Sequence, residues 1–155
     1  MTVPRIIMPL RTFLLLLASM LSASSAAALN LTAITPADGA TGVCADTPVR
    51  LTFHADVRLG AVGTVQLVDA ATGEVVDTAD LADPAPTRLI GGNATPFRYH
   101  PILATGRVAT FLPRAGVLAA GRTYRVRVSP GVFTGTGGDA FAGLAAGAEP
   151  RFTVR

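Results

Sequence analysis

Apolar and polar residues alternate along several short stretches of this chain. In 49–53 and 123–129, apolar side chains occupy every second position, and the positions between them hold mainly Arg or Thr. A period of two places the apolar side chains on one face of an extended strand. The pattern therefore predicts β-strands that each bury one face and leave the other face in water.

Similar short patterns occur along most of the chain after residue 28. They predict further strands at 30–35, 64–69, 74–78, 97–103, 107–112 and 151–154. Gly73 and Gly106 supply turns for two hairpins, and Ala82–Asn93 is predicted to be a loop. No convincing amphipathic helix is found, although 142–148 could form one helical turn. Seven or eight regularly spaced strands predict an all-β sandwich.

One corner of this sandwich carries a specific signature. Leu118, Gly121 and Tyr124 are spaced three residues apart and lead directly into the strand at 123–129. In an immunoglobulin-like antiparallel β-sandwich, a tyrosine at this corner hydrogen-bonds back to the preceding backbone, and a glycine permits the turn. Gly121 and Tyr124 are therefore assigned a structural role.

The first 28 residues predict a signal peptide rather than part of the fold. Arg5 and Arg11 precede an apolar run at 12–21, and the segment ends in Ala26-Ala27-Ala28, which fits an A-x-A cleavage site. A spanning helix needs roughly 20 apolar residues, about twice the length of this run. We expect a domain at 29–155 that is secreted, periplasmic or on the cell surface, and does not span a membrane.

Charge argues against a nucleic-acid partner. The chain has no Lys, so its 13 basic residues are all Arg, against 10 acidic residues. Removal of Arg5 and Arg11 with the leader leaves eleven against ten, a net charge of about +1. The arginines are interleaved with acids, whereas nucleic-acid binding requires them on one face.

Cys44 is the single cysteine. A buried, inert thiol is the simpler interpretation, and an intermolecular disulfide is the alternative. In either case the domain must be stabilised by its core alone.

Three blocks resemble the bacterial Ig-like domains of the SbsA type. They are TPADGATGV at 35–43 leading to the strand at 49–53, GRTYRVRV at 121–128, and FAG at 141–143 followed by RFTV at 151–154. This resemblance covers nearly all of 29–155 and implies an Ig-like sandwich. The chain departs from the family between 133 and 141, where the glycines remain but the usual acid is displaced. A ligand contact by that loop is therefore not carried over.

A narrower resemblance runs through the middle of the chain. Residues 63–78, 90–92, 97–102 and 116–118 are similar to a subgroup found ahead of pectinesterase-like catalytic domains in secreted bacterial proteins. This similarity implies association with extracellular pectin degradation, with a polysaccharide or a neighbouring secreted enzyme as the partner. The chain itself is too short for the β-helix of such an enzyme and has none of its catalytic motifs.

No residue pattern predicts catalysis. After the leader, the only His and Ser residues are His54, His100 and Ser129, and no nucleophile motif accompanies them. The histidines are interpreted as partly exposed strand residues. No catalytic residue and no cofactor is predicted.

Acidic residues gather near one strand end. Asp77, Asp80 and Asp83 could approach a sugar or a calcium ion, but calcium needs six to eight oxygen ligands. Asp38 and Asp46 flank the first turn, where aspartate commonly bonds its own backbone. We predict no metal site and interpret all five as solvated turn residues.

Aromatic residues offer the one candidate glycan contact. The chain has no Trp, and most of its rings are in phase with the core. Phe97 and Tyr99 are two residues apart on a predicted strand, which places both rings on one face as a small stacking platform. Phe133 and Phe141 are also candidates for exposure. A contribution to the core is the simpler interpretation for all four.

The main hypothesis is a secreted, non-catalytic Ig-like module that serves as a spacer, a surface-presentation domain or an interaction domain. A carbohydrate-binding accessory protein is the second hypothesis and rests on the middle blocks. A third is an N-terminal fragment of a pectinesterase-like enzyme, because the chain stops at Arg155, directly after a predicted closing strand.

Overall fold

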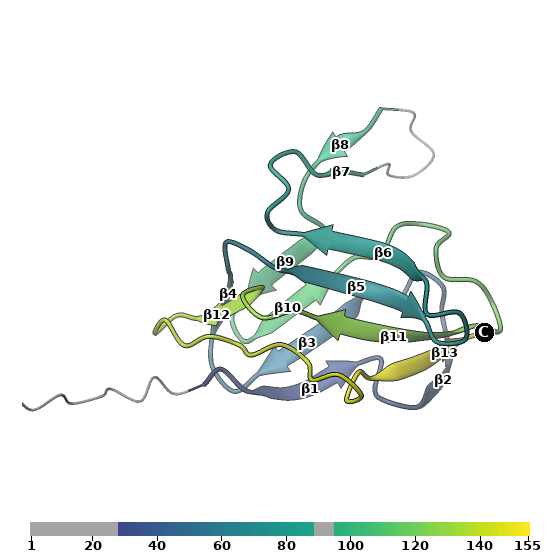
Figure 1. The fold of residues 1–155 in the computed structure, drawn as a ribbon, viewed down its shortest axis with the longest axis horizontal. Coiled ribbons are helices and arrows are strands. Elements are labelled where there is room, and N and C mark those ends of the chain that lie inside the picture. The colour runs from purple at the N-terminus through teal and green to yellow at the C-terminus, as the bar shows by residue number, and fades with distance from the viewer. Residues whose placement is uncertain (1–27, 89–94) are drawn as a thin grey trace, which may run out of the picture.

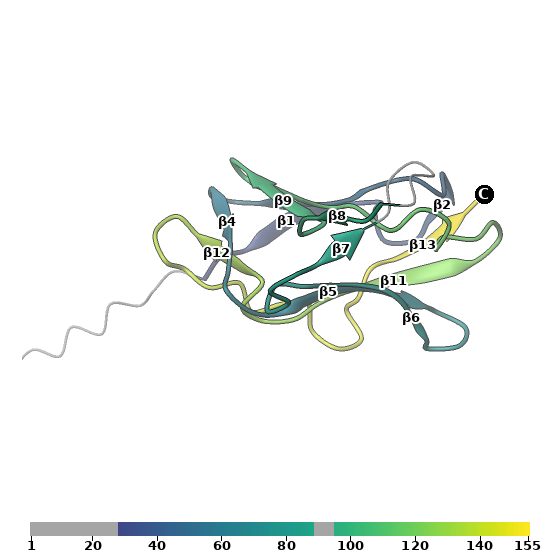
Figure 2. The ribbon, with the colours of Figure 1, turned by 90° about the horizontal axis from the view of Figure 1, so that it is seen from above.

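The chain folds into two packed β-sheets in a computed structural model that describes residues 28–88 and 95–155. One layer has the strand order β1 (Leu31–Thr35), β3 (Val49–Phe53), β10 (Val108–Phe111) and β9 (Ile102–Thr105). The other has the order β2 (Ala40–Val43), β13 (Arg151–Val154), β11 (Thr123–Val128), β5 (Thr64–Asp69) and β6 (Val75–Asp80). Figure 2 shows the two layers edge-on. All pairs in these two sheets are antiparallel except β13 with β2.

Two short antiparallel pairs complete the sandwich. β4 (Val57–Leu59) pairs with β12 (Phe133–Gly135), and β7 (Thr87–Arg88) pairs with β8 (Phe97–Arg98). The pair β7–β8 stands above β6 in Figure 1, and in Figure 2 it lies between β9 of one layer and β6 of the other. Within the described residues the structure is all-β, as predicted, and it contains no helix long and apolar enough to cross a membrane.

Alternation along the strands builds the core. In β3 every second residue is buried, and Val49, Leu51 and Phe53 are at most 1% exposed. β11 follows the same rule with Tyr124, Val126 and Val128. Because the two layers turn these faces toward each other, the apolar side chains are removed from water, which is the main stabilising term of the fold.

An aromatic cluster fills one end of the core. The ring of Phe53 lies 5.4 Å from that of Phe133 and 5.2 Å from that of Phe141, the latter nearly edge-to-face at 82°. Phe133 and Phe141 are 0% and 6% exposed. The simpler interpretation, that these two rings contribute to the core, is therefore confirmed, and the alternative of exposure is excluded for both.

The sequence pattern misplaced several boundaries. The segment predicted as one strand at 97–103 is divided into β8 and β9, and Tyr99, His100 and Pro101 lie between them outside any strand. Residues 142–148 form a turn instead of a helical turn. The loop predicted at Ala82–Asn93 contains β7, while 89–93 lie outside the described residues. The predicted signal peptide also lies outside them, except for Ala28.

The structure places Tyr124 at a tight corner before β11. The Tyr124 hydroxyl donates to the carbonyl oxygen of Val117 at 3.3 Å and accepts from the N–H of Ala119 at 2.8 Å. Gly121 adopts a φ of +74°, a left-handed conformation that a residue with a Cβ rarely adopts. The hydroxyl thus links Tyr124 to the loop before β11, in which Gly121 makes the turn.

We predict that Tyr124→Phe destabilises the domain by about 1 kcal/mol, because two partly buried hydrogen bonds to the backbone lose their shared hydroxyl. The urea midpoint of the purified domain measures this change. An unchanged midpoint would contradict the assigned role of the corner.

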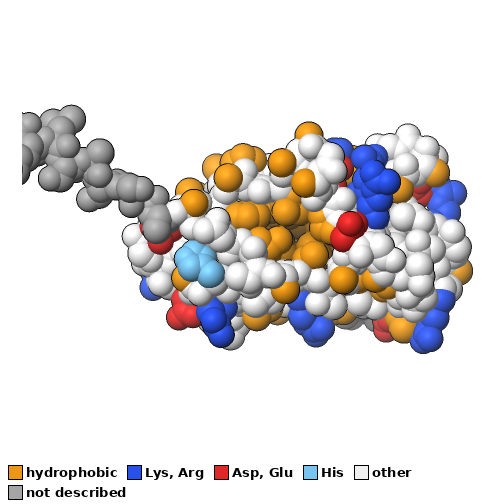
Figure 3. Space-filling view, turned by 90° about the horizontal axis from the view of Figure 1, so that it is seen from below, with side chains coloured by type: hydrophobic (Ala, Val, Ile, Leu, Met, Phe, Trp, Pro, Cys, Tyr) orange, Lys and Arg blue, Asp and Glu red, His pale blue; other side chains and the backbone are white. Residues whose placement is uncertain are grey.

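The lower side of the sandwich is less completely closed. Figure 3 shows a hollow with hydrophobic side chains on the side where β1, β2 and β13 lie in Figure 1. The partly buried apolar residues of β1 and β2 that pack against the core are Leu31, Ile34, Ala40 and Val43.

Candidate functional site

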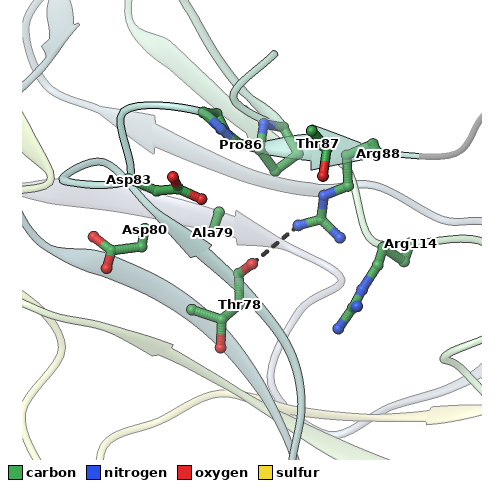
Figure 4. A pocket seen from close by; sticks show the side chains of 9 residues that line it. Thr78, Ala79, Asp80, Asp83, Pro86, Thr87, Arg88 and Arg114 are labelled. Carbon is green, nitrogen blue, oxygen red and sulfur yellow. Dashed lines mark hydrogen bonds between the residues drawn. The ribbon is translucent and has the colours of Figure 1, made fainter. Parts of the chain in front are cut away.

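A pocket of about 280 Å³ lies on the upper side of the sandwich, between β6 and the hairpin β7–β8. Its lining residues are Thr78, Ala79, Asp80, Asp83, Pro86, Thr87, Arg88, Pro101 and Arg114. Figure 4 shows Asp80 and Asp83 at one side of the pocket and Arg88 and Arg114 at the other. This is the part of the described surface where a hollow, charged groups and an exposed aromatic ring come together.

Asp77 does not line the pocket but binds both of the arginines that do. Its side chain on β6 is fully buried, and its Oδ1 accepts from Nη1 of Arg88 at 2.8 Å and from Nε of Arg114 at 2.9 Å. Its Oδ2 accepts from the backbone N–H of Arg114 at 2.8 Å. Arg88 is also buried, at 7% exposed. Asp77 therefore joins three segments of the chain through one carboxylate.

The two arginines also cover the free edge of β6. Nη2 of Arg88 donates to the carbonyl oxygen of Thr78 at 3.0 Å, the dashed line in Figure 4, and Nη2 of Arg114 donates to that of Val76 at 3.3 Å. An edge strand with unpaired backbone groups invites pairing with other chains. The cluster thus has a structural role that accounts for both cations.

These contacts correct the interpretation of Asp77 as a solvated turn residue. Asp80 and Asp83 do match that interpretation, since each accepts from a backbone N–H two residues later, at Ala82 and Ala85. Asp77 differs because it faces the inside of the sandwich, where a carboxylate is stable only with charged partners.

The charges around the pocket nearly cancel. Arg88 and Arg114 oppose three carboxylates, those of Asp77, Asp80 and Asp83, and both guanidinium groups are already engaged. A site of this kind has no strong preference for an anion. Within the described residues, the Oδ2 atoms of Asp80 and Asp83 accept no hydrogen bond, and together with the Thr87 hydroxyl they are suited to accept hydrogen bonds from a neutral, hydroxyl-rich ligand.

The predicted stacking residues lie beside this pocket. Phe97 is on β8, which pairs with the pocket-lining strand β7, and its side chain is 44% exposed. Tyr99 follows β8, is half-buried, and donates its N–H to the carbonyl oxygen of Pro86 at 3.1 Å. Because β8 ends at Arg98, the assumption that strand alternation places both rings on one face is not met. Phe97 is the more available ring.

The residues weighed for catalysis have other partners. The Ser129 hydroxyl accepts from the N–H of Thr64 at 2.7 Å, and Nδ1 of the exposed His54 accepts from the N–H of Asn30 at 3.1 Å. His100 lies between β8 and β9 rather than in a strand, and its buried Nδ1 has no hydrogen-bond partner among residues 28–88 and 95–155. These contacts do not arrange a nucleophile beside a base.

Other predicted groups are found on the surface. Asp38 accepts from the N–H of Arg151 at 2.8 Å. Cys44 is half-buried instead of fully buried, and its Sγ accepts from Nη2 of Arg155 at 3.0 Å. The alternative of an intermolecular disulfide stays untested. No group of three or more His, Cys, Asp or Glu residues able to hold a metal ion occurs within 28–88 and 95–155.

Asp69 and Arg122 form a second buried-carboxylate pair that sequence patterns did not predict. Asp69 ends β5, is 3% exposed, and accepts from Nε of Arg122 at 2.7 Å and from the N–H groups of Ala71 and Thr72. The Arg122 guanidinium, followed by these backbone donors, holds the pKa of Asp69 below its ordinary value of 3.8. This carboxylate ties the β5–β6 turn to the start of β11.

The lowered pKa of Asp69 predicts how the stability of the domain changes as the pH falls. The stabilisation from ionised Asp69 is fully present above pH 3.8 and is lost as the pH falls below this value through the lower pKa of the folded state. We therefore expect Asp69→Asn to lower the urea midpoint at about pH 6 and to cost progressively less toward about pH 2.5. A midpoint difference that does not change with pH would contradict this assignment.

Comparison with known proteins identifies the domain type. The family model described as "Bacterial Ig-like domain" matches residues 25–154. Among solved structures, the crystal structure of CopC from Methylosinus trichosporium OB3b is 21% identical, with 81% of this chain and 92% of that chain covered and a TM-score of 0.45. At that score the likeness carries no argument about function. No curated protein matches the chain.

Proposed function

The chain belongs to the family of bacterial Ig-like domains, and we propose that it is a secreted, non-catalytic module that makes contacts outside the cytoplasm. Its roles would be those of a spacer, a surface-presentation domain or an interaction domain. The proposal joins the family assignment to the leader pattern at 1–28, which has the basic start, apolar run and small-residue end of a signal peptide.

One observation on Leu29 carries this proposal. Leu29 would be the first residue after cleavage, its side chain is 2% exposed, and its N–H donates to the carbonyl oxygen of Ala140 at 3.3 Å. Core packing therefore begins at the residue directly after the predicted end of the leader. Cleavage after Ala28 would leave both sheets whole and would leave a terminal amine that can still donate to Ala140.

A carbohydrate-binding accessory role is the second candidate. It is supported by the exposed ring of Phe97 next to a pocket whose free acceptors suit sugar hydroxyls. The resemblance of the middle blocks to domains that precede pectinesterase-like enzymes points to pectin as the first polysaccharide to test. The partner would then be the polysaccharide or an enzyme that degrades it.

One assay separates these functions. Purified Leu29–Arg155 is mixed with pectin and with a panel of other polysaccharides, and both the protein left in solution and the released products are measured. Product release would contradict a non-catalytic module. Depletion without products supports the accessory role. If neither depletion nor product release occurs, the result supports a spacer or a protein-contact domain.

If a polysaccharide depletes the protein, we expect Phe97→Ala to reduce that affinity by about 1 kcal/mol, roughly fivefold, through loss of ring stacking. Tyr99→Ala should have a smaller effect because its side chain is half-buried. Val62→Ala is the matched control, since Val62 is an exposed apolar residue (57%) before β5 and does not line the pocket. Equal binding by Phe97→Ala and the control would contradict the accessory role of this ring.

A further inference from the structure

The bond at which the leader is predicted to be cut lies directly against the folded domain. Ala28 is exposed, whereas the next residue, Leu29, is 2% exposed and belongs to the main hydrophobic core. No residue therefore separates the Ala28–Leu29 bond from the packed part of the chain. In Figures 1 and 2 the described chain enters the sandwich at the end where β4 and β12 lie.

Backbone contacts hold the residues that follow this bond. The N–H of Leu29 donates to the carbonyl oxygen of Ala140 at 3.3 Å. The N–H of Asn30 donates to Nδ1 of His54 at 3.1 Å, and the carbonyl oxygen of Asn30 accepts from the N–H of His54, also at 3.1 Å. The next residue begins β1, which pairs with β3. The chain is thus fixed from its first buried residue onward.

This arrangement is closed to a peptidase. A peptidase binds its substrate as an extended chain on both sides of the bond that it hydrolyses. To be bound in this way, Leu29 and Asn30 must leave Ala140 and His54, and the Leu29 side chain must leave the core. The folded domain offers such a chain only when it opens locally, and cleavage then follows the population of the open form. An unfolded chain needs no opening.

We infer that the leader is removed before the domain folds, and that folding protects the Ala28–Leu29 bond from signal peptidase. This inference rests on the proposed secretion. Hydrolysis of the bond consumes one water molecule and leaves the carboxylate of Ala28 and the amine of Leu29, which can still donate to Ala140. A chain that folds first keeps the apolar run at 12–21. The relative rates of cleavage and folding therefore decide which form of the protein is made.

The test uses the full chain, residues 1–155, with purified bacterial signal peptidase in detergent. The parent is compared with a chain that carries a Gly-Ser spacer of about six residues between Ala28 and Leu29. The spacer moves the bond away from the core and changes no residue of the fold. Mass spectrometry of the product over time gives the site and the rate of cleavage.

An unfolded form of each chain is the matched control. Leu51→Asp and Val126→Asp together place a carboxylate in each sheet, at positions that are both 0% exposed, so these chains should not fold. Neither substitution alters the sequence around Ala28. The loss of the urea unfolding transition verifies that both control chains are unfolded, and its presence verifies that the parent and the spacer chain are folded.

We expect the folded parent to be cleaved at least about 100-fold more slowly than its unfolded form. The spacer should remove most of this difference, because the chain is then accessible on both sides of the bond. In the unfolded chains the spacer should have little effect, which shows that it does not itself create a better cleavage site.

The other outcomes contradict the inference in distinguishable ways. If the folded and unfolded parent chains are cleaved at the same rate, folding does not protect the bond, although the proposed secretion still holds. If the folded spacer chain is as resistant as the folded parent, closeness to the core is not the cause of protection. If the unfolded chains are not cleaved after Ala28, the predicted leader is wrong, and the proposed secretion is contradicted together with the inference.

Discussion

Asp77→Asn is expected to destabilise the domain by about 3 to 5 kcal/mol, a large share of the stability of a domain of this size. The change removes the negative charge from a fully buried side chain and leaves the buried guanidinium of Arg88 without its counter-ion. The carboxylate also receives the backbone N–H of Arg114, so one substitution weakens the attachment of two loops. Urea unfolding of the purified domain measures the loss.

The matched control for Asp77 is Asp80→Asn on the same strand. Asp80 is exposed, and within the described residues its side chain accepts only the local N–H of Ala82, a bond that an Asn oxygen can keep. We expect a change within about 0.5 kcal/mol. Similar losses in the two variants would show that Asp77 is not the organising residue of this edge.

Gly60→Ala should be the second most damaging change, at about 3 kcal/mol. Gly60 follows β4, and its N–H donates to the carbonyl oxygen of Val132 at 2.8 Å. A Cβ at this position would overlap the carbonyl oxygen of Gly131, which is backbone and cannot turn aside as a side chain can. We therefore expect β4 and β12 to move apart and the midpoint of thermal unfolding to fall.

Gly137→Ala separates this clash from a general effect of adding a methyl group. A Cβ at Gly137 would lie 3.5 Å from Oδ2 of Asp139, which is ordinary contact. Its φ is outside the positive set, so alanine fits the backbone and should change stability by less than about 1 kcal/mol. If Gly60→Ala were equally mild, β4 and β12 would not approach as closely as the structure indicates.

Local patterns predicted the parts of this fold that depend on neighbouring residues. The alternation in β3 and β11 is visible within five or six residues, and the burial of Val49, Leu51 and Phe53 follows it directly. The β5–β6 hairpin was also predicted, because a glycine occupies the turn position between the two strands. In the structure Gly73 adopts the left-handed conformation that this position requires.

The candidate site depended on distant residues and was therefore only partly predicted. Asp77 meets Arg88 and Arg114 from 11 and 37 positions away, and no periodic pattern connects such residues. The burial of Phe133 was the simpler interpretation, but β12 is too short for its alternation to decide between the core and the surface. In the sequence, an aspartate two residues before Ala79 on an apolar-phased strand was a signal for the cluster, and in the structure Asp77 and Ala79 are both buried.

The most direct test of a secreted Ig-like module is to express the full chain in a bacterium with a periplasm and to determine the N-terminal residue of the exported protein. We predict that it appears outside the cytoplasm and begins at Leu29, whose burial and bond to Ala140 place it at the start of the fold. A protein that stays in the cytoplasm with Arg5 and Arg11 still attached would contradict the account.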